Sequence, residues 1–188
     1  MASPFAPAKS RAESRNADKM DPYKVKAAFL YNFFNYTTWP DPENEKKPEP
    51  LELWVIGNDP FGSILDATFK KKEIGGRSIN IERFEEAPEK LTADMIFAGG
   101  IEQHELTALI AACADLPMLL IGDTDGFAEA GGSCNLSIKD SSIAIEVNTE
   151  VVKAAGLSIS SDLLKLSKIV KTKKGKKSSK LEEAEKGK

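Results

Sequence analysis

The chain has 188 residues, of which 41% are hydrophobic, 29% charged and 7% aromatic, and its net charge at neutral pH is −3. This composition is that of a soluble globular domain with its own core, and no apolar run approaches the ~18 residues of a membrane span. Residues 171–188 hold eight Lys against three Glu, which leaves a net charge of −8 on residues 1–170. An acidic body with a short basic end argues against nucleic-acid binding, which needs basic groups along one face.

The two ends differ from the body of the chain. Residues 1–20 are polar and contain no apolar stretch of the kind found in a signal peptide, so we expect a cytosolic protein or a mature exported form. We predict a disordered leader over residues 1–20, one α/β domain over residues 21–170 and a disordered Lys-rich tail over residues 171–188.

The first predicted element is an aromatic helix. Asp21 predicts its N-cap and Pro22 its first turn, and Pro40 predicts its end near Trp39, because the residue before proline avoids the helical conformation. Its apolar residues recur at helical spacing, in one stripe of Val25, Phe29, Phe33 and Tyr36 and a second of Leu30 and Phe34. We expect this face to pack under a sheet, with Trp39 as a structural anchor. The alternative is a surface for a partner helix or a flat ligand.

Strands and helices then alternate along the chain. Strand patterns occur at residues 51–57, 77–84, 93–100 and 116–123, and helical patterns at residues 61–71 and 101–115. Such alternation is typical of a largely parallel sheet with helices against it.

In the last part of the domain, the alternation of strands and helices gives way to a different pattern. Residues 133–138 and 143–147 predict two adjacent strands joined as a hairpin. Helical patterns follow, one with Thr149 as N-cap and Gly156 just past its end, and one over residues 160–170. The predicted fold class is therefore α/β: a single mixed sheet with helices packed against it, largely parallel in its first half and ending in a hairpin plus helices.

No catalytic, cofactor or metal site is predicted. The glycine pairs lack the spacing of phosphate-binding loops, and no GxSxG nucleophile elbow occurs. His104 is the single histidine and the cysteines lack CxxC spacing, so a tetrahedral zinc site is not expected. Asp123 and Asp125 follow a strand, but Phe127 stands where a calcium-binding loop needs its third oxygen ligand. We interpret Asp123 as a turn former that caps the next helix.

The two cysteines allow two states. A disulfide between Cys113 and Cys134 would close a loop of 21 residues and stabilise the fold by roughly 3 kcal/mol. Two buried free thiols are an equal alternative.

Among the acidic residues, Glu146 is the most suggestive of a functional role, because it lies between apolar neighbours in a predicted strand. If Ile145 and Val147 face the core, Glu146 faces the opposite side. We expect solvent on that side, with a pocket as the alternative.

Five segments occur in a particular order: "VKAAFLYNFFNYTTWP", "LWVIGNDPFG", "GRSINI", "LPMLLIGDTDGFAEAGGSCNLSI" and "IEVNTEVVKAAGLSISSDLLKLSKIV". In this order and at these distances they resemble the YfiR family of exported bacterial regulators. The resemblance implies a periplasmic, often dimeric, non-enzymatic domain that holds an inner-membrane diguanylate cyclase inactive by binding its periplasmic part. It also implies release by redox stress or by an outer-membrane lipoprotein.

The resemblance also suggests site residues. Some family members accept small aromatic or heterocyclic ligands in a surface pocket, and the resemblance places Glu146 and Ser160 where pocket residues are expected, with Arg77 as a weaker candidate. For Ser160, a plain helix N-cap is an equal interpretation.

The leading hypothesis is thus a periplasmic regulator in cyclic-di-GMP signalling. One alternative is a periplasmic ligand-sensing domain that serves a histidine kinase or a transport system. A second is a small α/β enzyme or nucleotide binder, which the missing motifs disfavour.

Overall fold

The computed structural model describes residues 21–40, 50–139 and 142–173, so the predicted leader and most of the predicted tail lie outside the described residues. The helices are α1 (Pro22–Tyr36), α2 (Ser63–Phe69), α3 (Gln103–Cys113), α4 (Phe127–Ala130), α5 (Thr149–Ala154) and α6 (Ser161–Lys165). The strands are β1 (Thr37–Thr38), β2 (Leu51–Gly57), β3 (Glu73–Ile74), β4 (Arg77–Phe84), β5 (Met95–Gly99), β6 (Leu119–Gly122), β7 (Cys134–Lys139), β8 (Ser142–Asn148), β9 (Ser158–Ile159) and β10 (Lys168–Val170).

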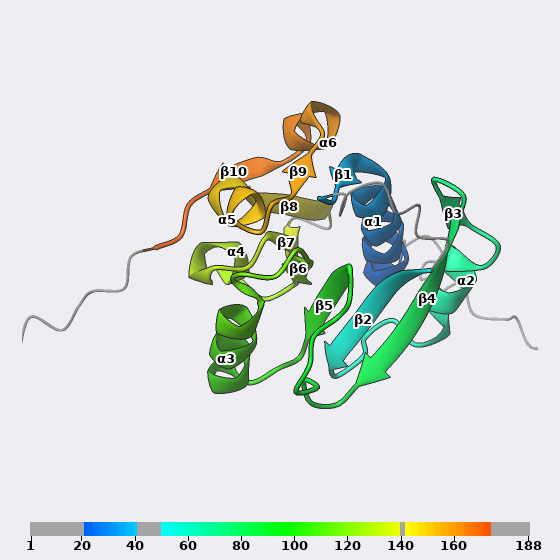
Figure 1. Cartoon of the computed structure of the whole chain (residues 1–188), viewed down its shortest axis with the longest axis horizontal. Helices are drawn as coiled ribbons and strands as arrows, with labels where there is room; N and C mark the ends of the chain where they lie inside the picture. Colours follow the sequence, from blue (N-terminus) through cyan, green and yellow to red (C-terminus); the bar gives the residue numbers. More distant parts are fainter. Residues whose placement is uncertain (1–20, 41–49, 140–141, 174–188) are drawn as a thin grey trace, which may run out of the picture.

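One eight-stranded sheet organises these elements (Figure 1), in the order β10-β8-β7-β6-β5-β2-β4-β3. Neighbouring strands from β4 through β2, β5 and β6 to β7 are parallel, and β7 and β8 form an antiparallel hairpin. The predicted fold class, a mixed sheet with a parallel first half and a C-terminal hairpin, is confirmed. The short strands β1 and β9 pair with each other outside this sheet.

The central strands are buried on both faces, which creates two cores. In β2, Leu53 and Val55 belong to a core under α1 and α2, whereas Trp54 and Ile56 belong to a second core on the α3 side. This alternation explains the continuous apolar run of β2, because a parallel strand covered on both faces has no polar side. The first core is the larger one and extends along the sheet to β8.

Helix α1 begins as predicted and ends earlier. The Asp21 carboxylate accepts a hydrogen bond from the Tyr23 backbone N at 2.9 Å. The helix stops at Tyr36 because Thr37 and Thr38 extend into β1, so the predicted end near Trp39 is three residues too late. Tyr36 is 41% exposed, so its placement on the buried stripe was also wrong.

Trp39 and most of the aromatic stripe pack as expected. Leu30, Phe33 and Phe34 are fully buried in the first core, and the Trp39 ring stacks on Phe34 with centroids 5.7 Å apart. The Trp39 indole N–H donates to the Asp94 carbonyl oxygen at 3.2 Å. The indole thus ties the end of α1 to the residue that precedes β5.

A buried ion pair joins α1 to the sheet, and the sequence patterns did not reveal it. Lys26 is 2% exposed, and its ammonium lies 2.8 Å from the carboxylate of Asp123, which follows β6. The interpretation of Asp123 as a helix cap is wrong, because the residue before α4 is Gly126 in a left-handed conformation. Asp123 instead supplies the counter-charge that the buried Lys26 ammonium requires.

The C-terminal segment also differs from its helical pattern. Helix α6 ends at Lys165, and Lys168–Val170 forms β10, parallel to β8. Leu166, which lies within the predicted helix over residues 160–170, is 71% exposed. The N-cap of α5 is Asn148, whose side chain accepts from the Val151 backbone N at 3.3 Å, one residue before the predicted Thr149.

We expect Asp123→Ala to destabilise the fold by about 3–5 kcal/mol, because it leaves the Lys26 ammonium buried without a counter-charge. The double variant Lys26→Met/Asp123→Asn removes both charges and should recover most of this loss. Urea unfolding at pH 7 measures both effects. The control Asp125→Ala changes an exposed carboxylate two residues away and should shift stability by less than about 0.5 kcal/mol. A double variant as unstable as Asp123→Ala would contradict the charge argument.

Candidate functional site

The three residues suggested for a site lie on separate parts of the structure. Arg77 begins β4 near one end of the sheet order and Glu146 lies on β8 near the other, with four strands between β4 and β8. Ser160 is the N-cap of α6, and its hydroxyl accepts from the Asp162 backbone N at 3.3 Å. Arg77 and Glu146 therefore do not share one pocket in the described structure, and Ser160 has the N-cap role that was its alternative interpretation.

Arg77 links the starts of neighbouring strands. Its Nη2 donates to the Pro50 carbonyl oxygen at 3.2 Å and lies 4.0 Å from the Asp94 carboxylate. The same carboxylate accepts from the Glu52 backbone N at 2.8 Å. These contacts lie at the amino ends of β4, β2 and β5.

Glu146 is the buried centre of a polar cluster. It is 6% exposed, and its Oε1 lies 3.3 Å from Lys139 Nζ and 3.2 Å from Lys168 Nζ. Asn135 Nδ2 donates to Oε2 at 3.5 Å. Ile145 and Val147 do face the core, but neighbouring side chains cover Glu146 on the other side, so the expected exposure to solvent is wrong.

The hydrogen bonds decide the charge state of Glu146. Burial raises its pKa, but the hydrogen bonds from Lys168, Lys139 and Asn135 outweigh burial, so the pKa of this carboxyl lies below its ordinary value. Two ammonium groups face one carboxylate, which leaves one positive charge in excess at this edge of the sheet.

Two buried polar atoms beside Glu146 lack a hydrogen-bond partner within the described residues. They are Asn135 Oδ1 and Ser137 Oγ, both on β7. Unsatisfied buried polar atoms are rare, so each calls for a partner outside this chain or a local rearrangement. The cluster can thus offer one acceptor, one hydroxyl and an excess of positive charge to a bound group.

Exposed large apolar side chains occur in the same half of the sheet. Ile138 is the next-to-last residue of β7, Leu166 follows α6 and Ile169 lies on the edge strand β10, and all three are exposed. We call these three residues the apolar edge. Large apolar side chains that gather on a surface are typical of sites where another macromolecule binds.

The cysteines do not form the possible disulfide. Both are free and buried, Cys113 in the second core and Cys134 in the first, on opposite faces of the sheet. The sheet separates the two thiols, which excludes a bond between them in this fold. Burial raises the pKa of Cys113 to about 12 and that of Cys134 well above its usual range, so both remain protonated at neutral pH.

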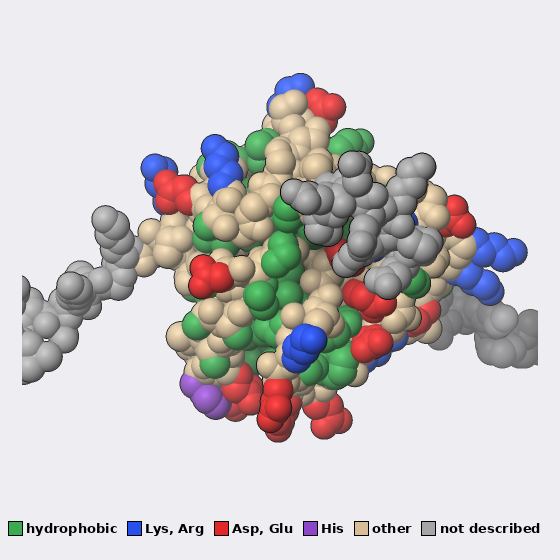
Figure 2. Space-filling view, in the orientation of Figure 1, with side chains coloured by type: hydrophobic (Ala, Val, Ile, Leu, Met, Phe, Trp, Pro, Cys, Tyr) green, Lys and Arg blue, Asp and Glu red, His purple; other side chains and the backbone are tan. Residues whose placement is uncertain are grey.

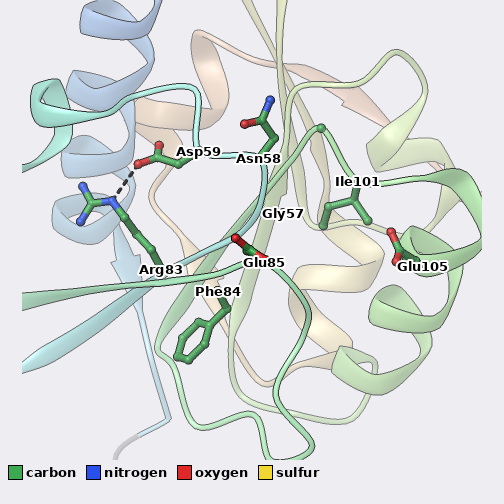
Figure 3. A pocket seen from close by; sticks show the side chains of 9 residues that line it. Gly57, Asn58, Asp59, Arg83, Phe84, Glu85, Ile101 and Glu105 are labelled. Atoms are coloured by element: carbon green, nitrogen blue, oxygen red, sulfur yellow. Dashed lines mark hydrogen bonds and ion pairs between the residues drawn. The ribbon is translucent and has the colours of Figure 1, made fainter.

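A depression of about 650 Å³ opens at the carboxyl ends of β2, β4 and β5 (Figure 3). It is lined by Gly57, Asn58, Asp59, Arg83, Phe84, Glu85, Gly100, Ile101 and Glu105. Gly57 and Gly100 both have positive φ, and a Cβ on Gly57 would collide with the Gly99 carbonyl oxygen and with Ile101. Bare backbone therefore forms the contact between the two loops.

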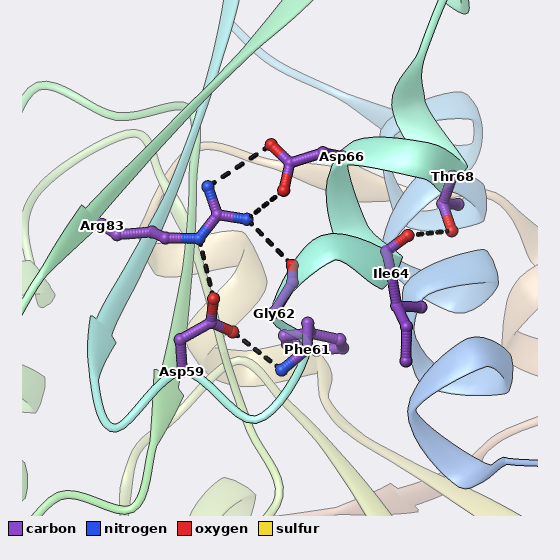
Figure 4. Close-up of polar contacts among 7 residues, drawn as sticks. All are labelled: Asp59, Phe61, Gly62, Ile64, Asp66, Thr68 and Arg83. Carbon is purple, nitrogen blue, oxygen red and sulfur yellow. Dashed lines mark hydrogen bonds and ion pairs between the residues drawn. The ribbon is translucent and has the colours of Figure 1, made fainter.

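One wall of the depression is a closed charge network around Arg83 (Figure 4). Arg83 Nε lies 2.7 Å from the Asp59 carboxylate, and Nη2 lies 2.6 Å from the Asp66 carboxylate and 3.2 Å from the Gly62 carbonyl oxygen. Burial lowers the pKa of Arg83, but the hydrogen bonds that its guanidinium donates to both carboxylates reverse this effect and raise the pKa. Sequence patterns did not predict this network, because its members come from the loop after β2, from α2 and from β4.

Comparison with known families places most of the described domain in one group of proteins. The sequence model of the family described as YfiR/HmsC-like matches residues 23–168 of the chain. No curated protein matches the chain at a significant level. Among the described residues, no helix has the length and hydrophobicity needed to cross a membrane.

We expect Glu146→Gln to cost about 1–3 kcal/mol of stability at pH 7, because the amide keeps the shape but loses charge-assisted hydrogen bonds from two lysines. A depressed pKa stabilises the folded state above the ordinary value of 4.5, and this contribution is lost as the pH falls through the lower folded-state value. Urea unfolding from pH 7 to pH 3 should show the gap between wild type and variant closing below about pH 4.5. The control Glu150→Gln, on an exposed pair with Lys171, should cost less than about 1 kcal/mol. A gap that is constant across this range would contradict the charged role of Glu146.

Buried, protonated thiols should be unreactive until the chain unfolds. We expect the native protein to react slowly with a thiol reagent at pH 7, and the protein unfolded without reductant to release two free thiols per chain. Fewer than two thiols after unreduced unfolding would show that a disulfide exists.

Proposed function

The chain belongs to the YfiR/HmsC-like family, and from this membership we propose that it is a non-enzymatic periplasmic regulator that restrains an inner-membrane diguanylate cyclase. In this proposal it binds the periplasmic part of the cyclase and lowers the synthesis of cyclic-di-GMP. The observation that carries the proposal is the family match over residues 23–168. An outer-membrane lipoprotein that relieves the restraint and a homodimer are further parts of the same proposal.

Restraint of this kind needs a binding surface rather than a catalytic group. A binder shifts a two-state enzyme only by the difference between its affinities for the two states. The apolar edge supports such a surface, because Ile138, Leu166 and Ile169 are exposed on β7, after α6 and on β10, in the same half of the sheet. Exposed lysines lie beside it, among them Lys165 and Lys168, which favours an acidic rim on the partner.

A second candidate function is ligand sensing on behalf of a histidine kinase or a transport system. The observation that favours it is the cluster around Glu146, where Asn135 Oδ1 and Ser137 Oγ are buried without partners among the described residues. In this alternative, a small aromatic or heterocyclic ligand near Glu146 would act through this cluster.

Deleting the gene for this protein in its host should raise cyclic-di-GMP, and supplying the protein in the periplasm should lower it again. The variant Leu166→Asp should fail to lower it, because a desolvated carboxylate would lie in the apolar contact. Folding should change by less than about 0.5 kcal/mol, since Leu166 is exposed. The control Ala108→Asp adds the same charge at an exposed site on α3 and should restore normal levels.

Two outcomes would count against this proposal. Unchanged cyclic-di-GMP after deletion, in a host that has a cyclase with a periplasmic domain, would favour ligand sensing. Full repression by folded Leu166→Asp would remove the apolar edge from the contact. Glu146→Lys is not a clean probe, because it would bury a third ammonium between Lys139 and Lys168.

A further inference from the structure

The outer side of strand β4 is open along most of its length. Strand β4 pairs with β2 from Ile79 to Phe84 in an unbroken register, whereas β3 pairs on its other side with only Arg77 and Ser78. Figure 1 shows β4 as the outermost long strand, with the short β3 beside its start. Within the described residues, the outer side of β4 from Ile79 to Phe84 therefore has no strand beside it.

This edge lacks common protections against pairing with a further strand. Lysine, proline and bulges protect many natural edge strands, because the unpaired N–H and C=O groups of an edge recruit another strand. Residues 79–84 contain no lysine or proline, and their register with β2 shows no bulge. The two charged residues of this stretch, Glu82 and Arg83, already have partners in the same chain. The edge is thus open to a strand whose side chains match its own.

The side chains of β4 match those of a second β4 that runs antiparallel to it. A two-fold axis through Ile81 places Ile79 opposite Arg83 and Asn80 opposite Glu82, and each of these pairs occurs twice. Asn80 Nδ2 donates to Glu52 at 2.9 Å and to Glu82 at the longer distance of 3.3 Å. The longer bond can pass to Glu82 of the second chain, so the pairing leaves no donor of Asn80 without an acceptor.

Two features of the strand fix this register. A shift of the axis to Asn80 would bring the second strand against Ser78, where β3 already lies. A shift to Glu82 would place two Glu82 carboxylates directly opposite each other, which destabilises a strand pair. The axis through Ile81 avoids both.

Charges beside the edge are complementary under the same symmetry. A groove of about 610 Å³ lies next to β4, and its lining includes Phe69, Ile79, Ile81 and the run Lys70–Lys72. Lys70 and Lys71 are exposed and make no ion pair among the described residues. Figure 2 shows basic side chains projecting at the margin of the molecule where α2 and β3 lie in Figure 1. Because Ile79 lies opposite Arg83 of the second chain, these lysines approach the Asp66 carboxylate that Arg83 holds there, which is 57% exposed.

We propose that the open edge of β4 pairs antiparallel with the same edge of a second copy of this chain, with Ile81 on the two-fold axis. The pairing joins two eight-stranded sheets into one continuous sheet and uses the same edge on both copies, so it produces a closed dimer rather than a filament. It gives the homodimer of the proposed function a defined interface and rests on that part of the proposal. The restraint of a cyclase does not depend on it.

Sedimentation of the purified full chain tests the pairing. The protein should form a reversible dimer with a dissociation constant below about 100 µM, and no larger species. A chain that stays monomeric at about 300 µM would overturn this interface together with the homodimer. The restraint of a cyclase would still be tested separately, by cyclic-di-GMP after gene deletion.

Charge variants at two exposed positions test the register. Asn80→Lys places an ammonium opposite Glu82 of the second chain and should tighten the dimer about threefold. Asn80→Lys/Glu82→Lys places lysines opposite each other twice and should weaken the dimer about tenfold relative to wild type. A general effect of net charge has the opposite sign, because the double variant removes the net charge of −3 and so reduces repulsion between copies.

A matched control separates the edge from the rest of the surface. Gln103→Lys/Asp115→Lys makes the same change of net charge at exposed residues on α3 and just after it, and it should not weaken the dimer. Urea unfolding checks that every variant is folded. A dimer that keeps its wild-type strength in folded Asn80→Lys/Glu82→Lys would place the homodimer on another surface and refute this interface. Equal weakening by the control would refute it as well.

Discussion

Burial of the central strands on both faces is the constraint on which the rest of the structure depends. Because Leu53 and Val55 face one core while Trp54 and Ile56 face the other, helices must cover both sides of β2. The aromatic face of α1 covers one side, and the Lys26–Asp123 ion pair ties that helix to the end of β6. Such a pair adds little net stability but specifies one position for α1, since any other leaves a buried charge unpaired.

The same constraint explains where the molecule offers surfaces. The middle of the sheet is covered, so exposed chemistry is confined to the strand ends and to the outer strands. The apolar edge and the Glu146 cluster occupy the end formed by β7, β8 and β10, and the depression occupies the carboxyl ends of β2, β4 and β5. These regions differ in charge, because one has two lysines around Glu146 and the lining of the other holds three carboxylates and one arginine.

Sequence patterns predicted what depends on local periodicity. The buried runs of β2, β5 and β6, the β7–β8 hairpin and the Asp21 cap all follow from neighbours within a few residues. The patterns failed where a partner distant in the chain decides. Lys168–Val170 has helical spacing but pairs with β8, and Asp123 resembles a turn former but neutralises a lysine 97 residues away.

The candidate site residues show the same limit, because their partners are distant in the chain. Glu146 was singled out by its position between two apolar residues, yet its burial depends on Lys139 and Lys168, which reach it from β7 and β10. Nothing in the segment around residue 146 predicts that β10 pairs with β8, and residues 168–170 were themselves expected to be helical. The depression depends likewise on three strand ends that only the crossover at β2 brings together. Sites built from several chain segments thus become visible only when the strand order is known, whereas a buried strand can be recognised from its own residues.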